Sequence, residues 1–191
     1  MAKISVCPWW LGYFLINPLR RFLHNPAEII APYIKEGMTV VEPGPGMGFF
    51  TLELANKVGP SGHVIAIDIQ PKMIASLKQR AERSHLMERI DIRLALPESM
   101  GLVKLAGTVD FIFTFAVVHE LPDINSFFLE AAKALKPNAL LLLVEPTGHV
   151  NADQFSAELV IASQHGLEVI DTPAIRRSHS ALLKKHHNPV S

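Results

Sequence analysis

The sequence has few of the features that mark secreted, membrane-spanning or nucleic-acid-binding proteins. Its single cysteine, Cys7, cannot form an intrachain disulfide, which excludes a disulfide-rich secreted scaffold. Its 18 lysine and arginine residues balance 18 aspartate and glutamate residues, so the chain has no general basic field for DNA or RNA. Pro8 and Pro18 interrupt the apolar N-terminal stretch before it reaches a spanning length of about 20 residues. With no secretory signal evident, we expect a cytoplasmic protein.

What the chain does contain is enough apolar sequence for a folded core. Of its 191 residues 49% are hydrophobic and 19% are charged, which argues against disorder. A chain of this length buries a substantial core as one domain.

The most informative stretch is Val40–Phe50, which is Val-Val-Glu-Pro-Gly-Pro-Gly-Met-Gly-Phe-Phe. A β-branched run ends in an acid, three glycines follow at alternate positions, and an amphipathic run begins at Phe49. This pattern predicts a strand, a tight turn and a helix start, as in the first βα unit of a nucleotide-binding sheet. The backbone of such a turn comes close to a ligand, and the helix N-terminus offers free N–H groups.

The spacing of these glycines separates two classes of ligand. The dinucleotide pattern requires a small residue five positions after Gly44, where this chain has Phe49. Glu42 would also repel a pyrophosphate, whereas it suits a ligand that carries an ammonium group. A P-loop is excluded because no Gly-Lys-Ser/Thr follows.

The segment from Glu42 to Gly48 resembles the first motif of the class I S-adenosylmethionine-dependent methyltransferases. The resemblance covers roughly residues 38–185. It implies S-adenosylmethionine as cofactor and S-adenosylhomocysteine as product. The implied cofactor-binding residues lie at the ends of successive strands: Glu42, Pro43, Gly44, Pro45, Gly46, Gly48, Asp68, Ile69, Ala95, Leu96 and Phe115.

Asp68 ends a buried-strand pattern 20 residues after Gly48, where one carboxylate can accept from both ribose hydroxyls. NAD would satisfy this acid equally well, so Asp68 supports the fold more than the cofactor. In many relatives an acid follows strand three and contacts the adenine amino group. Here the segment is Leu94-Ala95-Leu96-Pro97, with Glu98 expected inside the next helix. We therefore expect apolar contacts to adenine from Ile69 and Leu96.

The alternation of strand and helix patterns predicts a doubly wound α/β fold. Only a few residues, around 174–177, separate the last two strand-like runs, 167–173 and 178–184. Since parallel neighbours need a much longer crossover, this pair must be antiparallel. We expect a seven-stranded, mostly parallel sheet with one antiparallel C-terminal strand and helices on both faces. Further expected elements are helices at 26–35, 49–58, 71–84, 123–135 and 151–165, and strands at 39–42, 63–68, 90–95, 109–115 and 139–144.

Candidate catalytic residues follow the fourth strand. Methyltransferases of nucleic-acid amino groups usually carry Asn/Asp-Pro-Pro-aromatic at this point, but the chain has Thr114-Phe115-Ala116-Val117. The following His119-Glu120 resembles a segment of small-molecule methyltransferases, and His119 is the candidate base. Glu145, after the fifth strand, is similarly placed. No metal site is expected, since the paired histidines near the C-terminus lack further ligands at a recognisable spacing.

The first 37 residues form a separate aromatic segment, ahead of a cofactor-binding domain at 38–191. The aromatic side chains before residue 25 have three interpretations: a cap on the core, a lid over the active site, or an interfacial segment beside Arg20 and Arg21. If this segment covers the site, Tyr13 and His24 would line the acceptor pocket.

The sequence therefore predicts a methyltransferase acting on a small and in part hydrophobic acceptor. Two alternatives stay open: an NAD(P)-binding oxidoreductase, and a non-catalytic S-adenosylmethionine-binding protein. Arsenic-methylating relatives use several cysteines, which Cys7 alone cannot replace. The acceptor atom and the oligomeric state are not predicted.

Overall fold

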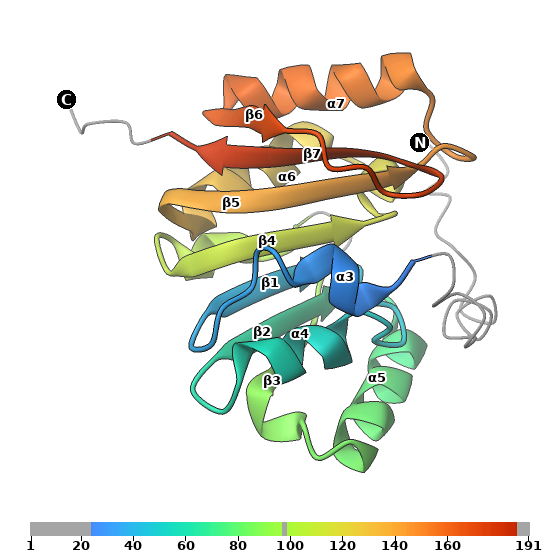
Figure 1. Cartoon of the computed structure of the whole chain (residues 1–191), viewed down its shortest axis with the longest axis vertical. Coiled ribbons are helices and arrows are strands. Elements are labelled where there is room, and N and C mark those ends of the chain that lie inside the picture. Colours follow the sequence, from blue (N-terminus) through green and yellow to red (C-terminus); the bar gives the residue numbers. More distant parts are fainter. Residues whose placement is uncertain (1–23, 97–98, 187–191) are drawn as a thin grey trace.

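The computed structural model describes residues 24–96 and 99–186, and this part is organised around one seven-stranded sheet (Figure 1). The strands are rich in β-branched and aliphatic residues, as expected for segments buried on both faces. They are β1 (Thr39–Pro43), β2 (His63–Asp68), β3 (Ile90–Leu94), β4 (Val109–Phe115), β5 (Leu135–Pro146), β6 (Leu167–Asp171) and β7 (Ser178–Lys185).

The strand order is β3-β2-β1-β4-β5-β7-β6. The first five strands are parallel, while β7 is antiparallel to both β5 and β6. The predicted C-terminal hairpin is therefore confirmed. From β1 the chain first builds outward to β3 and then returns to β4 on the other side. The topological switch point, where ligands bind in such sheets, lies between the carboxyl ends of β1 and β4.

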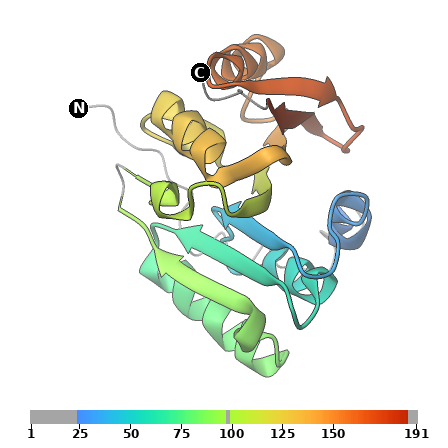
Figure 2. The same cartoon turned by 90° about the vertical axis from the view of Figure 1, so that its left-hand side faces the viewer.

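Helices cover the two faces of the sheet and enclose two apolar cores. They are α3 (Pro26–Ile30), α4 (Thr51–Val58), α5 (Pro71–Arg83), α6 (Ile124–Ala134) and α7 (Ala152–Gln164), with 3-10 turns η2 (Met87–Arg89), η3 (Leu102–Leu105) and η4 (Val118–Glu120). Residues of α3, α4 and α5 share one buried cluster, and residues of α6 and α7 share the other. Figures 1 and 2 show α3 and α6 on opposite sides of the sheet.

Two helix boundaries differ by two or more residues from the sequence-based ones, and the fifth strand differs as well. The predicted helix at 26–35 ends at Ile30 and continues as a turn, since Pro32 has no N–H for a helical hydrogen bond. The predicted helix at 49–58 begins only at Thr51, because the glycine turn extends to Phe50. The fifth strand begins earlier than predicted, at Leu135, but its register against β4 is interrupted before Leu140.

Several predictions fall on parts of the chain outside the described residues. They include Glu98 in a helix, and the roles of Cys7, Tyr13 and the aromatic residues before His24. The division at residue 37 stays a prediction. Among the described helices, none combines the length and the apolar character needed to cross a membrane.

Candidate active site

The glycine turn after β1 forms the centre of the predicted cofactor site. Gly44, Gly46 and Gly48 have backbone φ angles of +66°, +55° and +83°. Residues other than glycine rarely adopt this region. A Cβ on Gly44 would lie 2.5 Å from a methyl carbon of Val117, and one on Gly48 would lie 2.4 Å from Leu77. A Cβ on Gly46 would meet no atom within 4 Å. Two glycines therefore allow tight packing, while Gly46 faces open space that a ligand can occupy.

Asp68 lies beside this turn at the carboxyl end of β2. One oxygen accepts the N–H of Gly46 at 3.2 Å and the other accepts the N–H of Gln70 at 2.8 Å. Burial raises the pKa of Asp68 to about 6, although the backbone N–H groups act in the opposite direction. Each carboxylate oxygen has a further lone pair for a ligand donor. Asp68, which we predict to bind ribose, thus lies beside the glycine turn and anchors it.

The other predicted cofactor residues gather at the same edge of the sheet. Glu42 is 3% exposed at the end of β1, and its strand neighbour is Ala66 of β2. Ile69 and Ala95 are half-buried, and the N–H of Ala95 donates to the carbonyl of Asp68 at 2.9 Å. Leu96 is 72% exposed, an apolar surface that an adenine ring would cover. The charged, open and apolar positions at this edge fit the ammonium, ribose and adenine groups of S-adenosylmethionine. They are Glu42, Asp68, Gly46 and Leu96.

Phe115 at the end of β4 lies among other aromatic rings. It contacts Phe50 at a ring-centre distance of 4.8 Å and His24 edge-on at 5.0 Å. His24 Nε2 also lies 2.8 Å from the carbonyl oxygen of Arg176 in the β6–β7 connection. His24, predicted as an acceptor-pocket residue, is therefore at this edge, whereas Tyr13 lies outside the described residues.

The chain then turns sharply into η4. Ala116 has φ +59°, and its N–H donates to the carbonyl of Val144 in β5 at 2.8 Å. A left-handed conformation is unfavourable for alanine, and strained residues of this kind cluster at functional sites. The turn directs Val117 against Gly44 and places His119 beside the end of β5.

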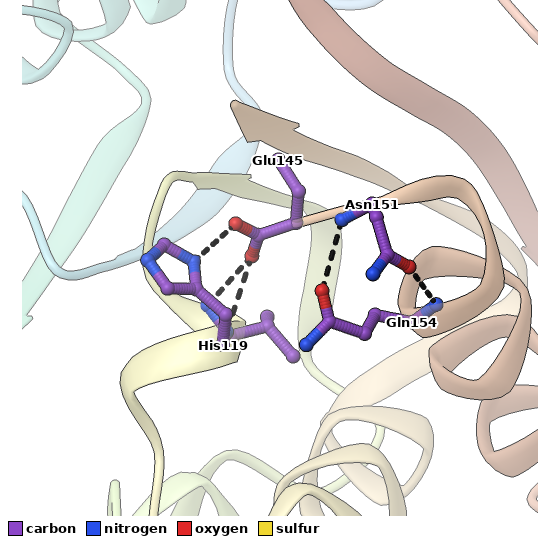
Figure 3. A network of polar contacts seen from close by, with 5 residues as sticks. His119, Glu145, Asn151 and Gln154 are labelled. Carbon is purple, nitrogen blue, oxygen red and sulfur yellow. Dashed lines mark hydrogen bonds and ion pairs between the residues drawn. The ribbon is translucent and has the colours of Figure 1, made fainter. Parts of the chain in front are cut away.

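His119 and Glu145 meet at the carboxyl ends of β4 and β5 (Figure 3). His119 Nδ1 lies 2.5 Å from Glu145 Oε2. Glu145 Oε1 accepts the backbone N–H of Val118 at 2.8 Å and that of His119 at 3.4 Å. The Glu145 side chain is completely buried, whereas that of His119 is 18% exposed. Figure 3 shows the second ring nitrogen of His119, Nε2, pointing away from the carboxylate.

The ionisation of His119 reflects this environment. Burial by itself lowers the pKa of His119. The hydrogen bond and the charge of Glu145 outweigh burial, and Glu120 and Glu158 add to their effect, so the pKa is raised overall. A carboxylate that binds one ring nitrogen fixes the tautomer and leaves the other nitrogen for a substrate. This arrangement suits a general base.

Sequence reasoning missed one residue of this cluster, Glu158 of α7. It is 4% exposed and lies on the buried face of the helix with Phe155 and Ala162. Its spacing from these two residues, three and four positions, would have indicated a glutamate facing the core. The pairing of His119 with Glu145 was also not predicted, although both residues were candidates.

Comparisons with known proteins identify the family of this chain. A family model described as a methyltransferase domain matches residues 34–178. Arsenite methyltransferase from Aquipseudomonas alcaligenes is 30% identical over 152 residues, covering 73% of this chain and 44% of that protein. Protein-L-isoaspartate O-methyltransferase from Methanothrix thermoacetophila is 37% identical over 136 residues, covering 71% of this chain and 58% of that protein. The chain thus spans about half the length of these curated relatives.

A solved structure extends the match to nearly the whole chain. The crystal structure of a SAM-dependent methyltransferase from Aquifex aeolicus superposes with a TM-score of 0.83 at 25% identity. The match covers 94% of this chain and 99% of that one. The predicted fold and the predicted cofactor are confirmed. The chain belongs to the class I S-adenosylmethionine-dependent methyltransferases, within the family described as a methyltransferase domain.

Proposed function

We propose that this chain transfers the methyl group of S-adenosylmethionine to a small, largely apolar acceptor, with His119 removing a proton from the acceptor. The observation that carries the proposal is the His119–Glu145 pair at the edge of the sheet. A buried carboxylate that binds one ring nitrogen holds the imidazole in the tautomer that a base requires.

The residues proposed to hold the cofactor are those at the ends of the first strands. The glycine turn, with open space at Gly46, would accommodate the ligand's close approach. Asp68 would accept from the ribose hydroxyls, and Glu42 would attract the ammonium group. Leu96 would cover the adenine ring, as predicted. When bound, S-adenosylmethionine supplies an activated methyl group on a cationic sulfur, so the protein needs no nucleophile of its own.

The proton step uses side chains of this chain alone. In neutral His119, the Nδ1–H group donates a hydrogen bond to Glu145. The lone pair of Nε2 is then available to a hydroxyl, thiol or ammonium group of the acceptor. The imidazolium that forms stays beside the Glu145 carboxylate, which stabilises it. A base of this kind contributes about 10²- to 10⁴-fold to the rate.

An open groove at the same edge supports an apolar acceptor. It lies between α7 and the β6–β7 connection and has a volume of about 740 Å³, within the range of small-molecule sites. Phe155, Leu159, Pro173 and Ile175 provide apolar walls, and His179 lines it from β7. In the register of β5 and β7, His179 lies directly opposite Glu145. His179 in the wall of the groove is therefore paired in the sheet with the strand residue Glu145.

The relatives' names suggest acceptors to try. Besides the enzymes named for arsenite and protein L-isoaspartate, the relatives include a demethylmenaquinone methyltransferase from Lactobacillus johnsonii and a phosphoethanolamine N-methyltransferase from Caenorhabditis elegans. Since the resemblance implies several cysteines in arsenic-methylating relatives, the single cysteine of this chain argues against arsenite. Phenols and quinols have the acidic hydroxyl and the apolar ring that the proposal requires.

The first experiment is calorimetric titration with S-adenosylmethionine, S-adenosylhomocysteine and NADH, repeated with Asp68→Ala. We expect binding of the first two, a strong loss in the variant, and no response to NADH. Acceptors are then screened by release of S-adenosylhomocysteine. His119→Gln should bind the cofactor normally and lose about 10²- to 10⁴-fold in turnover. Normal turnover of His119→Gln would refute the base, and binding without turnover of any acceptor would favour a non-catalytic protein.

A further inference from the structure

Glu158 is a buried carboxyl that the proposed chemistry has not used. It lies in the second turn of α7, on the buried face of the helix, and is 4% exposed. Within residues 24–96 and 99–186, no donor forms a hydrogen bond with its Oε2 atom. A buried carboxyl without donors is unfavourable as an anion and is therefore stabilised in its protonated form.

The groups that act on Glu158 come from neighbouring elements. Burial is the main cause that raises its pKa, to about 7, and the negative charge of Glu145 in β5 adds to this. His119 in η4 acts in the opposite direction. From β7, His179 lies opposite Glu145 and stacks on Phe155, one turn before Glu158.

The two buried carboxyl groups differ in their hydrogen bonding. Glu145 accepts from two backbone N–H groups and from the ring of His119. Hydrogen bonds to a carboxylate favour its ionised form, so Glu145 holds the negative charge. Glu158 has no such donors on Oε2, and two adjacent buried anions repel each other. The proton of the pair therefore belongs on Glu158.

We propose that Glu158 is a positioning residue that keeps a proton beside the His119–Glu145 pair and thereby sets the pH range in which His119 acts as a base. This inference rests on the proposed function of His119. Below about pH 7 neutral Glu158 leaves His119 under the influence of Glu145 and Glu120 alone. Above this pH, the ionised carboxylate of Glu158 adds a negative charge that stabilises the protonated imidazole of His119.

Other ionisable groups also lie near His119. Glu120 on η4 also raises the pKa of His119, and the ring of His149 lies 5.4 Å from its ring. Helix α6, which packs against α7, contributes Asn125, whose side chain bonds His165 two turns after Glu158. Any variant of Glu158 therefore has to be compared with a variant that removes a charge elsewhere on the same helix.

The test is an NMR titration of the His119 imidazole in Glu158→Gln, with the signal assigned by its loss in His119→Gln. We expect the pKa of His119 to fall by about 0.5 to 1 unit, because a nearby negative charge is removed. Asp153→Asn removes the same charge from an exposed position in the first turn of α7 and should leave the pKa of His119 unchanged. An unchanged value in Glu158→Gln would overturn the proposal.

A second measurement uses the unsubstituted side chain, in case Glu158→Gln does not fold. Infrared spectra between pH 4 and pH 9 should show a protonated carboxyl group that titrates near pH 7. Asp68 contributes a similar signal near pH 6, so the spectra are recorded in Asp68→Asn. No protonated carboxyl at pH 6 in that variant would overturn the proposal.

These two measurements require no acceptor and no turnover. If the coupling is found but His119→Gln remains active, the proposed base is wrong while the charge cluster is real. Once an acceptor is known, the rising limb of its kcat/KM profile should move to lower pH in Glu158→Gln and not in Asp153→Asn. A limb that stays in place would contradict the positioning role.

Discussion

Gly46 offers a direct test of where the ligand approaches the glycine turn. Its φ of +55° places it in the left-handed region, and a Cβ there would meet no protein atom within 4 Å. In Gly46→Ala the added methyl group therefore perturbs the free protein only through the backbone. Forcing an alanine into this region costs about 1–2 kcal/mol.

Gly107 provides a matched control. Its φ is +66°, a Cβ there also meets nothing within 4 Å, and it lies between η3 and β4, away from the carboxyl ends of the strands. Both alanine variants should therefore lose about 1–2 kcal/mol of unfolding free energy. For a domain of this size, each kcal/mol corresponds to about 2–4 °C in Tm. Thermal denaturation should show similar shifts for the two variants.

Ligand binding should separate them. If the cofactor occupies the open space at Gly46, the extra methyl group produces an overpacking penalty of about 1–3 kcal/mol in the complex. Calorimetric titration should then show S-adenosylhomocysteine binding weakened about 5- to 150-fold in Gly46→Ala and unchanged in Gly107→Ala. Equal affinities in the two variants would refute the argument, because Gly46 would then serve only the backbone of the turn.

Gly44→Ala differs from both variants in its expected effect. There the new Cβ overlaps Val117 at 2.5 Å, in addition to the strain of φ +66°. Its Tm should therefore fall further than that of Gly46→Ala. A smaller fall in Tm would mean that the Val117 side chain can move away from the glycine turn at little cost in stability.

Two further predictions concern stability. Because the folded pKa of Asp68, about 6, is above its model-compound value of 3.8, the protonated form stabilises the fold and this stability is lost as pH rises from about 4 to 6. As pH rises across this range, the unfolding free energy of the wild type should fall by up to about 3 kcal/mol more than that of Asp68→Asn. The same pH dependence of the unfolding free energy in both proteins would contradict this prediction. Asn151 and Gln154 form a reciprocal capping box at the start of α7, with both hydrogen bonds at 2.9 Å (Figure 3). Asn151→Ala should lower stability by about 1 kcal/mol in denaturant titrations, whereas Asn151→Ser should retain most of it.

Much of the fold was predictable because its signals are local. The strands at 63–68 and 109–115 have the predicted bounds, since each is a mostly apolar run between turn residues. The short separation of the last two strands required an antiparallel hairpin, and the structure contains it. The helix starts were less accurate, because the extent of the glycine turn depends on packing of Gly44 and Gly48 against distant side chains.

The positions of candidate site residues at strand ends were predictable for a related reason. Parallel strands end at one edge of a sheet, so Glu42, Asp68 and His119 had to gather there once the strands were recognised. The left-handed turn at Ala116 carried no such signal, since alanine does not favour that conformation. It arises because the N–H of Ala116 bonds to β5.

The sequence alone therefore determined the family, the glycine turn and the edge of the sheet at which the candidate site residues lie, because glycine spacing and hydrophobic periodicity act over a few residues. Only the tertiary structure decided which ionisable groups interact. His119 and Glu145 are 26 residues apart, and Glu158, whose charge interacts with both, lies on a third element. Their charges depend on burial and on the donors around each carboxyl group, and these properties exist only when β4, β5 and α7 are packed together.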